Sequence, residues 1–364
     1  MSSSTLTPLA GLWPSAGLWP NAGLWPNAGL WPNAGLWPSA GLWPNGGLGP
    51  SVIGTSMLRG QLVGDSVAEP LRPIQPILGQ APLLTQGAIP RAQSFLLEAT
   101  GGLRVQVASG AVEVHCLAER DKALSWQPLL RFYRPPPELF QAQVALVDAE
   151  LPLRETRAGE VLAQSSNAFS FFLGATAVPW NRRPRSLEFI DIALNLMQML
   201  QQRVKQLLAC ARPHTLQPAL MPIIEVPEHG SLPSGHAGES RLVAELIGHW
   251  AQLANAQSPV PGMLDRLATR IAHNRVVAGV HFPVDSVAGG LLGQCVFAYL
   301  RAAIEQEAAQ FGEFGHREAS GWGRFELVTP ENAAAHAVLT PAGFTPPALP
   351  DLAALWALAC AEWQ

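Results

Sequence analysis

The spacing of apolar and polar positions changes along the chain and predicts where strands give way to helices. Residues 94–133 alternate apolar and polar side chains around glycine turns, which is typical of half-buried strands. From residue 138 onward apolar residues recur every three or four positions, the spacing of amphipathic helices. The helices expected to surround one site cover 185–211, 235–256 and 284–304. A further helix is expected over 350–364, packed on the bundle or on a second subunit.

These patterns divide the chain into three expected regions. Residues 1–50 form a low-complexity tail, residues 51–135 a linker with a small strand-containing part, and residues 136–364 a helical domain. With 364 residues, of which 48% are hydrophobic, the chain is long enough to bury a substantial core. The expected fold class is mainly α, a helical bundle preceded by a small β-containing element.

The tail is a repeat. Residues 10–45 hold six near-identical copies of AGLWPN or AGLWPS, and no charged residue precedes Arg59. A proline in every copy prevents a continuous helix, so the stretch is not expected to span a membrane, and it lacks the basic start of a secretory signal. We expect an extended tail without a catalytic role. A functionally silent duplication is favoured over a tryptophan-rich surface that binds a partner.

Composition excludes some partners and compartments. The net charge is −4 and charged residues are scarce, so the basic stripe of a nucleic-acid-binding protein is missing. The uncharged run 286–300 is shorter than a bilayer requires, which predicts no transmembrane segment. The four cysteines form no Cys-x-x-Cys pair and predict a reducing compartment. Together these features predict a soluble, cytoplasmic protein; a homo-oligomer is left open.

Candidate chemistry begins at the segment SLPSGHAGES, residues 231–240. Ser234 is placed as the N-cap of the expected helix, where backbone N–H groups lack intrahelical partners and favour an anion. Gly235 lets a tetrahedral oxyanion approach the backbone closely. Taken alone, the segment is also typical of an ordinary helix start followed by a solvated His236.

Charged residues on either side change this interpretation. Upstream, KQLLACARP sets Lys205 and Arg212 seven residues apart, which would put both cations on one face of an apolar helix. Downstream, NRVVAGVHFPVD carries Arg275, His281 and Asp285, with the carboxylate close enough to orient the imidazole. The alternatives are two snorkelling side chains upstream and a surface salt bridge downstream.

In chain order the motifs are Lys-x6-Arg-Pro, Pro-Ser-Gly-His and Arg-x5-His-x3-Asp. Over about residues 185–300 the chain therefore resembles the superfamily of type 2 phosphatidic acid phosphatases, bacterial acid phosphatases and vanadium haloperoxidases. The resemblance implies a helical bundle of that type. It also implies that His281 is the nucleophile or the vanadate ligand, that His236 is the acid/base and that Asp285 fixes the tautomer of His281. The residues implied to hold phosphate or vanadate are Lys205, Arg212, Ser234, Gly235 and Arg275.

Three positions are compared with the family pattern. Asn274 stands where the third motif usually has Ser, and Gln202 where the haloperoxidases have an aromatic residue. His229 occupies a place where some algal bromoperoxidases also have histidine.

Three functions follow in order of preference. The first is a soluble, metal-independent phosphatase that hydrolyses a small phosphate ester through a phosphohistidine and needs no cofactor. The second is a haloperoxidase that binds vanadate in the same site and uses halide and peroxide. The third is a non-catalytic protein that binds an anion or another protein.

Overall fold

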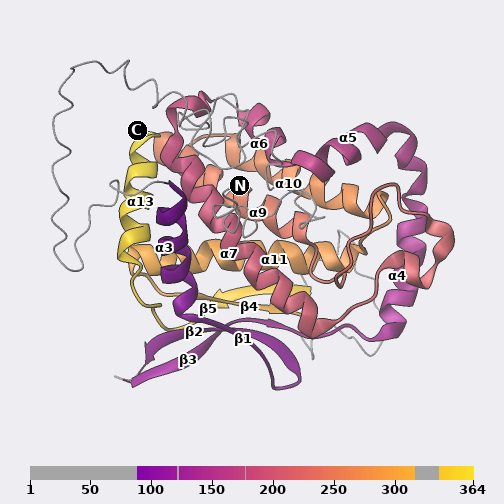
Figure 1. The fold of residues 1–364 in the computed structure, drawn as a ribbon, viewed down its shortest axis with the longest axis horizontal. Helices are drawn as coiled ribbons and strands as arrows, with labels where there is room; N and C mark the ends of the chain where they lie inside the picture. The colour runs from indigo at the N-terminus through magenta and orange to yellow at the C-terminus, as the bar shows by residue number, and fades with distance from the viewer. Residues whose placement is uncertain (1–87, 121–122, 177, 316–335) are drawn as a thin grey trace, which may run out of the picture.

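The computed structural model describes residues 88–120, 123–176, 178–315 and 336–364. The repeat and residues 51–87 of the expected linker region lie outside these residues. The helices that carry or surround the motifs are α4 (Pro137–Ala149), α5 (Arg154–Asn167), α6 (Phe169–Thr176), α7 (Pro184–Leu208), α8 (Pro213–Leu216), α9 (Gly235–Ala254), α10 (Val260–Val277) and α11 (Pro283–Glu305) (Figure 1). The others are α3 (Ala88–Gly101), α13 (Pro350–Ala361) and the 3-10 turns η4 (Leu151–Leu153), η5 (Trp180–Arg182) and η6 (Pro218–Leu220).

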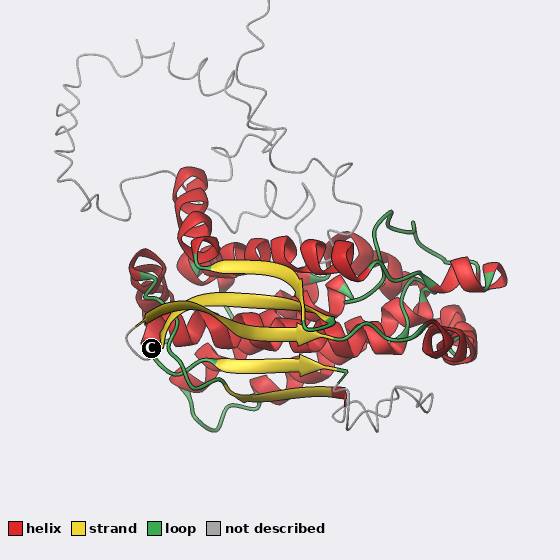
Figure 2. Cartoon of the chain, turned by 90° about the horizontal axis from the view of Figure 1, so that it is seen from below, coloured by secondary structure: helices red, strands yellow, loops and turns green. Residues whose placement is uncertain are grey.

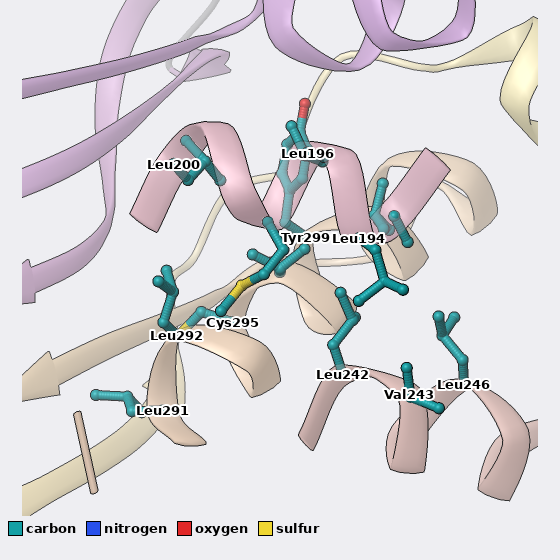
Figure 3. Close-up of a cluster of buried hydrophobic side chains, with 14 of the residues drawn as sticks. Leu194, Leu196, Leu200, Leu242, Val243, Leu246, Leu291, Leu292, Cys295 and Tyr299 are labelled. Carbon is teal, nitrogen blue, oxygen red and sulfur yellow. The ribbon is translucent and has the colours of Figure 1, made fainter. Parts of the chain in front are cut away.

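The centre of the molecule is a bundle in which α9 packs against α7, α10 and α11. Apolar side chains from α7, α9 and α11 gather in one buried cluster (Figure 3). Its labelled members include Leu196 on α7, Leu242 on α9 and Leu292 on α11, each at most 1% exposed. The expected mainly α fold is confirmed, and it holds the ends of these helices in fixed relative positions.

A five-stranded sheet covers one side of the bundle (Figure 2). Its strands follow the order β1-β2-β3-β4-β5, and all neighbours are antiparallel except β3 and β4, which are parallel. The strands are β1 (Leu103–Ala108), β2 (Ala111–Arg120), β3 (Ala123–Phe132), β4 (Gln310–Phe314) and β5 (Ala337–Pro341). The first three confirm the strand pattern of the sequence, whereas β4 and β5 were not predicted.

The expectation of strands from residue 94 is wrong for the first eight residues. These residues belong to α3, whose Ala92, Phe95 and Ala99 are buried at a spacing of three and four residues. That spacing places them on one helical face, against the bundle. The apolar run FLL and the two glycines after it resemble a strand and a turn but end a helix.

The end of α7 also differs from the expectation. The helix ends at Leu208, and Ala209 follows in the left-handed conformation with φ 48°. Arg212 therefore lies beyond the helix, so the expected two-turn spacing from Lys205 on one helical face is wrong. The other two expected helices, 235–256 and 284–304, agree with α9 and α11 to within two residues at each end.

Helix α11 bears on the expected absence of a membrane span, which stays a prediction. It has 23 residues and is long and apolar enough, by length and composition, to cross a membrane, so the run judged too short is part of a longer helix. It is the one such helix in the described part of the chain, and 61% of its most apolar window is buried inside the protein. A buried bundle helix and a membrane span share this composition.

The expected boundary at residue 135 stays a prediction. In the described residues, side chains from both sides of it, such as Phe95 and Trp363, belong to one hydrophobic cluster. Strand β3 also pairs with β4, from the far end of the chain.

Candidate active site

The three motifs meet where helix ends converge. Lys205 is in the last turn of α7 and Arg275 in the last turn of α10. His236 is in the first turn of α9 and Asp285 in the first turn of α11. The Ser234 N–H donates to the Asp285 carbonyl over 2.8 Å, which ties the starts of α9 and α11 together.

His281 and Asp285 form the expected pair. The distance from His281 Nδ1 to Asp285 Oδ2 is 3.0 Å, and both side chains are buried. The carboxylate also accepts the Phe282 N–H over 2.9 Å and the Ser231 hydroxyl over 3.4 Å. Because the carboxylate accepts, Nδ1 carries the proton, and Nε2 of His281 keeps its lone pair for an electrophile or a metal oxyanion.

The upstream cations are buried and bound mainly to the backbone. Lys205 Nζ donates to the carbonyls of Gly230 and Ser231, each over 3.2 Å. Arg212 donates to the carbonyls of His229, over 3.0 Å, and Val280, over 2.8 Å. Neutral carbonyls orient these cations without neutralising them, so the charge remains available for an anion.

Arg275 is held from another direction, by α5. Its guanidinium donates to Ser165 Oγ and to the Val161 carbonyl, each over 2.9 Å, and to Gln164 Oε1 over 3.3 Å. Its Nε has no hydrogen-bond partner among the described residues. His236 Nε2 lies 3.4 Å from the carbonyl of the same Gln164.

Ser234 is at the N-cap position of α9, but its side chain does not cap the helix. The hydroxyl is fully buried and has no hydrogen-bond partner within the described chain. The expected capping bond is therefore wrong, and an orphaned donor stands at the positive end of a helix. The next residue is constrained as well, because a Cβ on Gly235 would lie 3.3 Å from the amide of Gln201.

Burial perturbs every titratable group of the site. It lowers the pKa of Arg212 and of Arg275 to about 10. Burial, followed by the charge of Arg212, lowers the pKa of Lys205, whereas burial raises the pKa of Asp285. The pKa values of His236 and His281 fall well below the usual range, first through burial and then through the charges of Arg275 and Arg212 respectively. Asp285 offsets part of the charge of Lys205 and Arg212, and the positive charge that remains buried favours a bound anion.

Sequence reasoning missed part of the site. Gln164 contacts Arg275 and His236, and Ser165 contacts Arg275. Both residues precede the first motif by about forty residues and follow no motif spacing. His229 lies beside Arg212, with Nδ1 3.2 Å from Nη2, and burial lowers its pKa to about 4. The only sequence signal for His229 is its match to a histidine of some algal bromoperoxidases.

The comparisons with known proteins agree with the motifs. Residues 190–308 match the model of the PAP2 superfamily, which confirms the family resemblance for the segment that carries the site. Decaprenylphosphoryl-5-phosphoribose phosphatase of Mycobacterium tuberculosis, in strains CDC 1551 and H37Rv, is 31% identical over 126 residues. That match covers 35% of this chain and 64% of the relative's length.

A solved structure is similar at lower identity. It is the first transmembrane PAP2 type phosphatidylglycerolphosphate phosphatase from Bacillus subtilis, 20% identical, with a TM-score of 0.35. The match covers 44% of this chain and 84% of that chain.

Proposed function

We propose that this chain is a phosphatase that hydrolyses phosphate monoesters through a phosphohistidine on His281. The proposal rests on a set of buried hydrogen-bond donors, which we call the cradle. Lys205 and Arg212 are buried near His281, and Arg275 is buried near His236. The orphaned Ser234 hydroxyl stands at the N-terminus of α9. Such fixed donors stabilise the charge on the equatorial oxygens of a phosphoryl group in transfer.

The proposed reaction has two steps. In the first, His281 Nε2 attacks phosphorus, the bond from phosphorus to the ester oxygen breaks, and His236 gives its proton to the departing alkoxide. In the second, His236 takes a proton from water, the water oxygen attacks the phosphohistidine, and inorganic phosphate leaves. Asp285 holds the proton on Nδ1 throughout, since its Oδ2 accepts from that nitrogen.

His236 takes up the proton that it donates only once the substrate is bound. In the empty site burial and Arg275 hold the pKa of His236 low, so the ring is neutral near pH 7. A phosphate dianion between the cations offsets their charge and raises the pKa of this histidine. Binding of the ester therefore prepares the acid that the first step uses.

The substrate is proposed to be a monoester of an alcohol. The name of the mycobacterial relative places a phosphate on C5 of a ribose, which is an ester of this kind. The haloperoxidase hypothesis uses the same cradle, with vanadate in place of phosphate and His281 Nε2 as its ligand. Gln202 favours the phosphatase, whereas His229 favours the haloperoxidase.

The test compares two esters in the presence of a chelator. We expect the purified protein to release phosphate from both a nitrophenyl and an alkyl phosphate. His236→Ala should lower the rate on the alkyl ester by about a hundredfold or more, but less on the nitrophenyl ester, whose leaving group hardly needs a proton. Equal losses on both esters would remove His236 from the role of acid. Bromination with vanadate and peroxide, without phosphate release, would replace the proposal by the haloperoxidase.

A further inference from the structure

Helix α5 covers the site and supplies oxygen atoms whose place a bound phosphate would take. Arg275 donates to Val161, Gln164 and Ser165 of this helix, and His236 Nε2 lies 3.4 Å from the Gln164 carbonyl. Oxygens of α5 thus stand beside the two residues that are proposed to bind and protonate the ester. The helix precedes the matched segment 190–308, so it is not part of the family resemblance.

Asn274 explains how α5 is held there. It stands where the family motif usually has Ser, and its side chain is fully buried. Asn274 Nδ2 donates to Glu160 Oε1 over 2.8 Å and to Gln164 Oε1 over 2.9 Å, both on α5. A serine hydroxyl has one hydrogen to donate and could serve only one of these acceptors. The departure from the motif therefore adds a link between α10 and α5.

Apart from this link, α5 is held by few buried apolar contacts and by polar links at its edge, among them Arg270 to Glu160 and Arg154 to the Val277 carbonyl. Only Val161 and Gln164 of the helix are buried. Val161 packs in a small cluster with Val277, Ala278 and Val280 that is separate from the main core. Few buried apolar contacts give an element a low free energy of local opening. Yet Lys205, Arg275, His236 and His281 are each at most 6% exposed, so little of these side chains is open to an arriving ester.

We propose that α5 is a lid over the phosphate site, latched by Asn274, and that an arriving phosphate displaces its oxygens from Arg275 and His236. This inference rests on the proposed function. The exchange favours opening because the lid offers neutral oxygens, whereas phosphate offers charged ones that bind a guanidinium more strongly. The lid thus supplies hydrogen-bond partners to Arg275 until the anion arrives.

A competing lid has a distinctive consequence for affinity. Phosphate binds only the open state, so its apparent dissociation constant is raised by the cost of opening. Asn274→Ser shortens the latch, and Ser165→Ala removes an oxygen from Arg275. Each should tighten the binding of inorganic phosphate by about three- to tenfold, the worth of one hydrogen bond. A residue that merely supported the cradle would weaken binding when removed.

The experiment combines calorimetry with hydrogen exchange on the full chain. Inorganic phosphate is titrated into wild type, both variants, and Ser166→Ala, a matched control whose hydroxyl bonds to the Ala163 carbonyl on the exposed side of α5. We expect tighter binding in the two variants and no change in the control. In the wild type, phosphate should accelerate exchange of the amides of residues 154–167.

Unchanged or weaker binding in both variants, or slower exchange in α5 with phosphate, would overturn the lid. If Asn274→Ser does not fold, Ser165→Ala alone decides. A Lys205→Met variant distinguishes failure of the lid proposal from failure of the proposed function. If wild type binds phosphate, Lys205→Met does not, and the lid variants bind no tighter than wild type, the lid proposal is contradicted and the phosphate site is supported. When wild type binds no phosphate, the proposed function falls and the lid with it.

Discussion

At the residue scale, the buried hydroxyl of Ser234 connects the geometry of the site to its ligand. A hydroxyl at an N-cap normally accepts a hydrogen bond from the first turn of its helix. Here it accepts none and is fully buried, beside the start of α9. A buried polar atom without a partner costs stability in the empty protein, and a bound phosphate oxygen would remove that cost.

Ser234→Ala tests this interpretation with two readouts. Replacing a capping serine by alanine usually costs about 1 kcal/mol, but here no capping bond is lost, so the free energy of unfolding should stay the same or rise. The value of kcat/KM for an aryl phosphate should fall by about tenfold to a hundredfold, because a transition-state donor is lost. Urea unfolding and steady-state kinetics measure the two effects. Lower stability with unchanged kinetics would identify Ser234 as an ordinary cap.

The motif residues could be predicted from the sequence, but the residues of α5 could not. Each motif sits at a helix end, and helix ends are encoded locally by proline, glycine and capping residues, so residues such as His281 and Asp285 could be placed together. Gln164 reaches Arg275 across 111 positions of sequence, through packing of two helices. No local pattern encodes such a contact, and in the sequence Asn274 is only a departure from a motif.

At the element scale, the close approach of α9 and α11 sets the shape of the cradle. Both start at the site, and glycines stand at their contact. A Cβ on Gly289 would collide with the Ser234 carbonyl and lie 3.2 Å from the Gly238 nitrogen. The missing Cβ at this position therefore lets the N-terminus of α9 sit against α11, whose first turn carries Asp285.

Adjacent glycines on α11 offer a matched pair of variants. Gly289→Ala should force α9 and α11 apart, with a loss of about 1–3 kcal/mol of stability, as in other overpacked cores, and with reduced phosphate binding. Gly290→Ala has open space around the new methyl group and should gain up to about 1 kcal/mol from helix propensity. Thermal unfolding and phosphate titration of both variants check this. Equal behaviour of the two would mean that the α9–α11 contact yields easily and does not shape the site.

At the scale of the whole molecule, the part of the fold that the sequence pattern did not predict is held by pairing between strands far apart in the chain. Strand β4 joins β3 from about 180 residues away in the chain, and five-residue strands have too weak a pattern to be recognised alone. The bundle, in contrast, follows from long periodic helices. The sheet packs on α11, whose first turn carries Asp285, so it also supports the site.

Buried neutral histidines also make the stability of the whole molecule depend on pH. His236 has a folded-state pKa well below the value of about 6.5 for an unfolded chain, so below pH 6.5 the unfolded state binds a proton that the folded state does not. Stability therefore falls as pH falls through this window. His229 and His281 act in the same direction, whereas the raised pKa of Asp285 opposes them.

The contribution of His236 to the pH dependence of stability is measured by comparing wild type with a variant that lacks this histidine. Between pH 6 and pH 5 the free energy of unfolding of wild type should fall more steeply than that of His236→Gln, by about 1.4 kcal/mol per pH unit at most. Urea unfolding at several pH values, without phosphate, gives both slopes. Parallel slopes would show that the His236 ring is protonated in the folded protein over this range.

The central claim is that His281 carries the phosphoryl group, and trapping that intermediate tests it most directly. The enzyme is mixed with a nitrophenyl ester of radioactive phosphate, quenched in alkali, which preserves phosphohistidine, and mapped by peptide. Wild type should carry the label on His281, His236→Ala should accumulate it because water is no longer activated, and His281→Ala should carry none and release no phosphate. Phosphate release that continues in His281→Ala, or a label on another residue, would contradict the account.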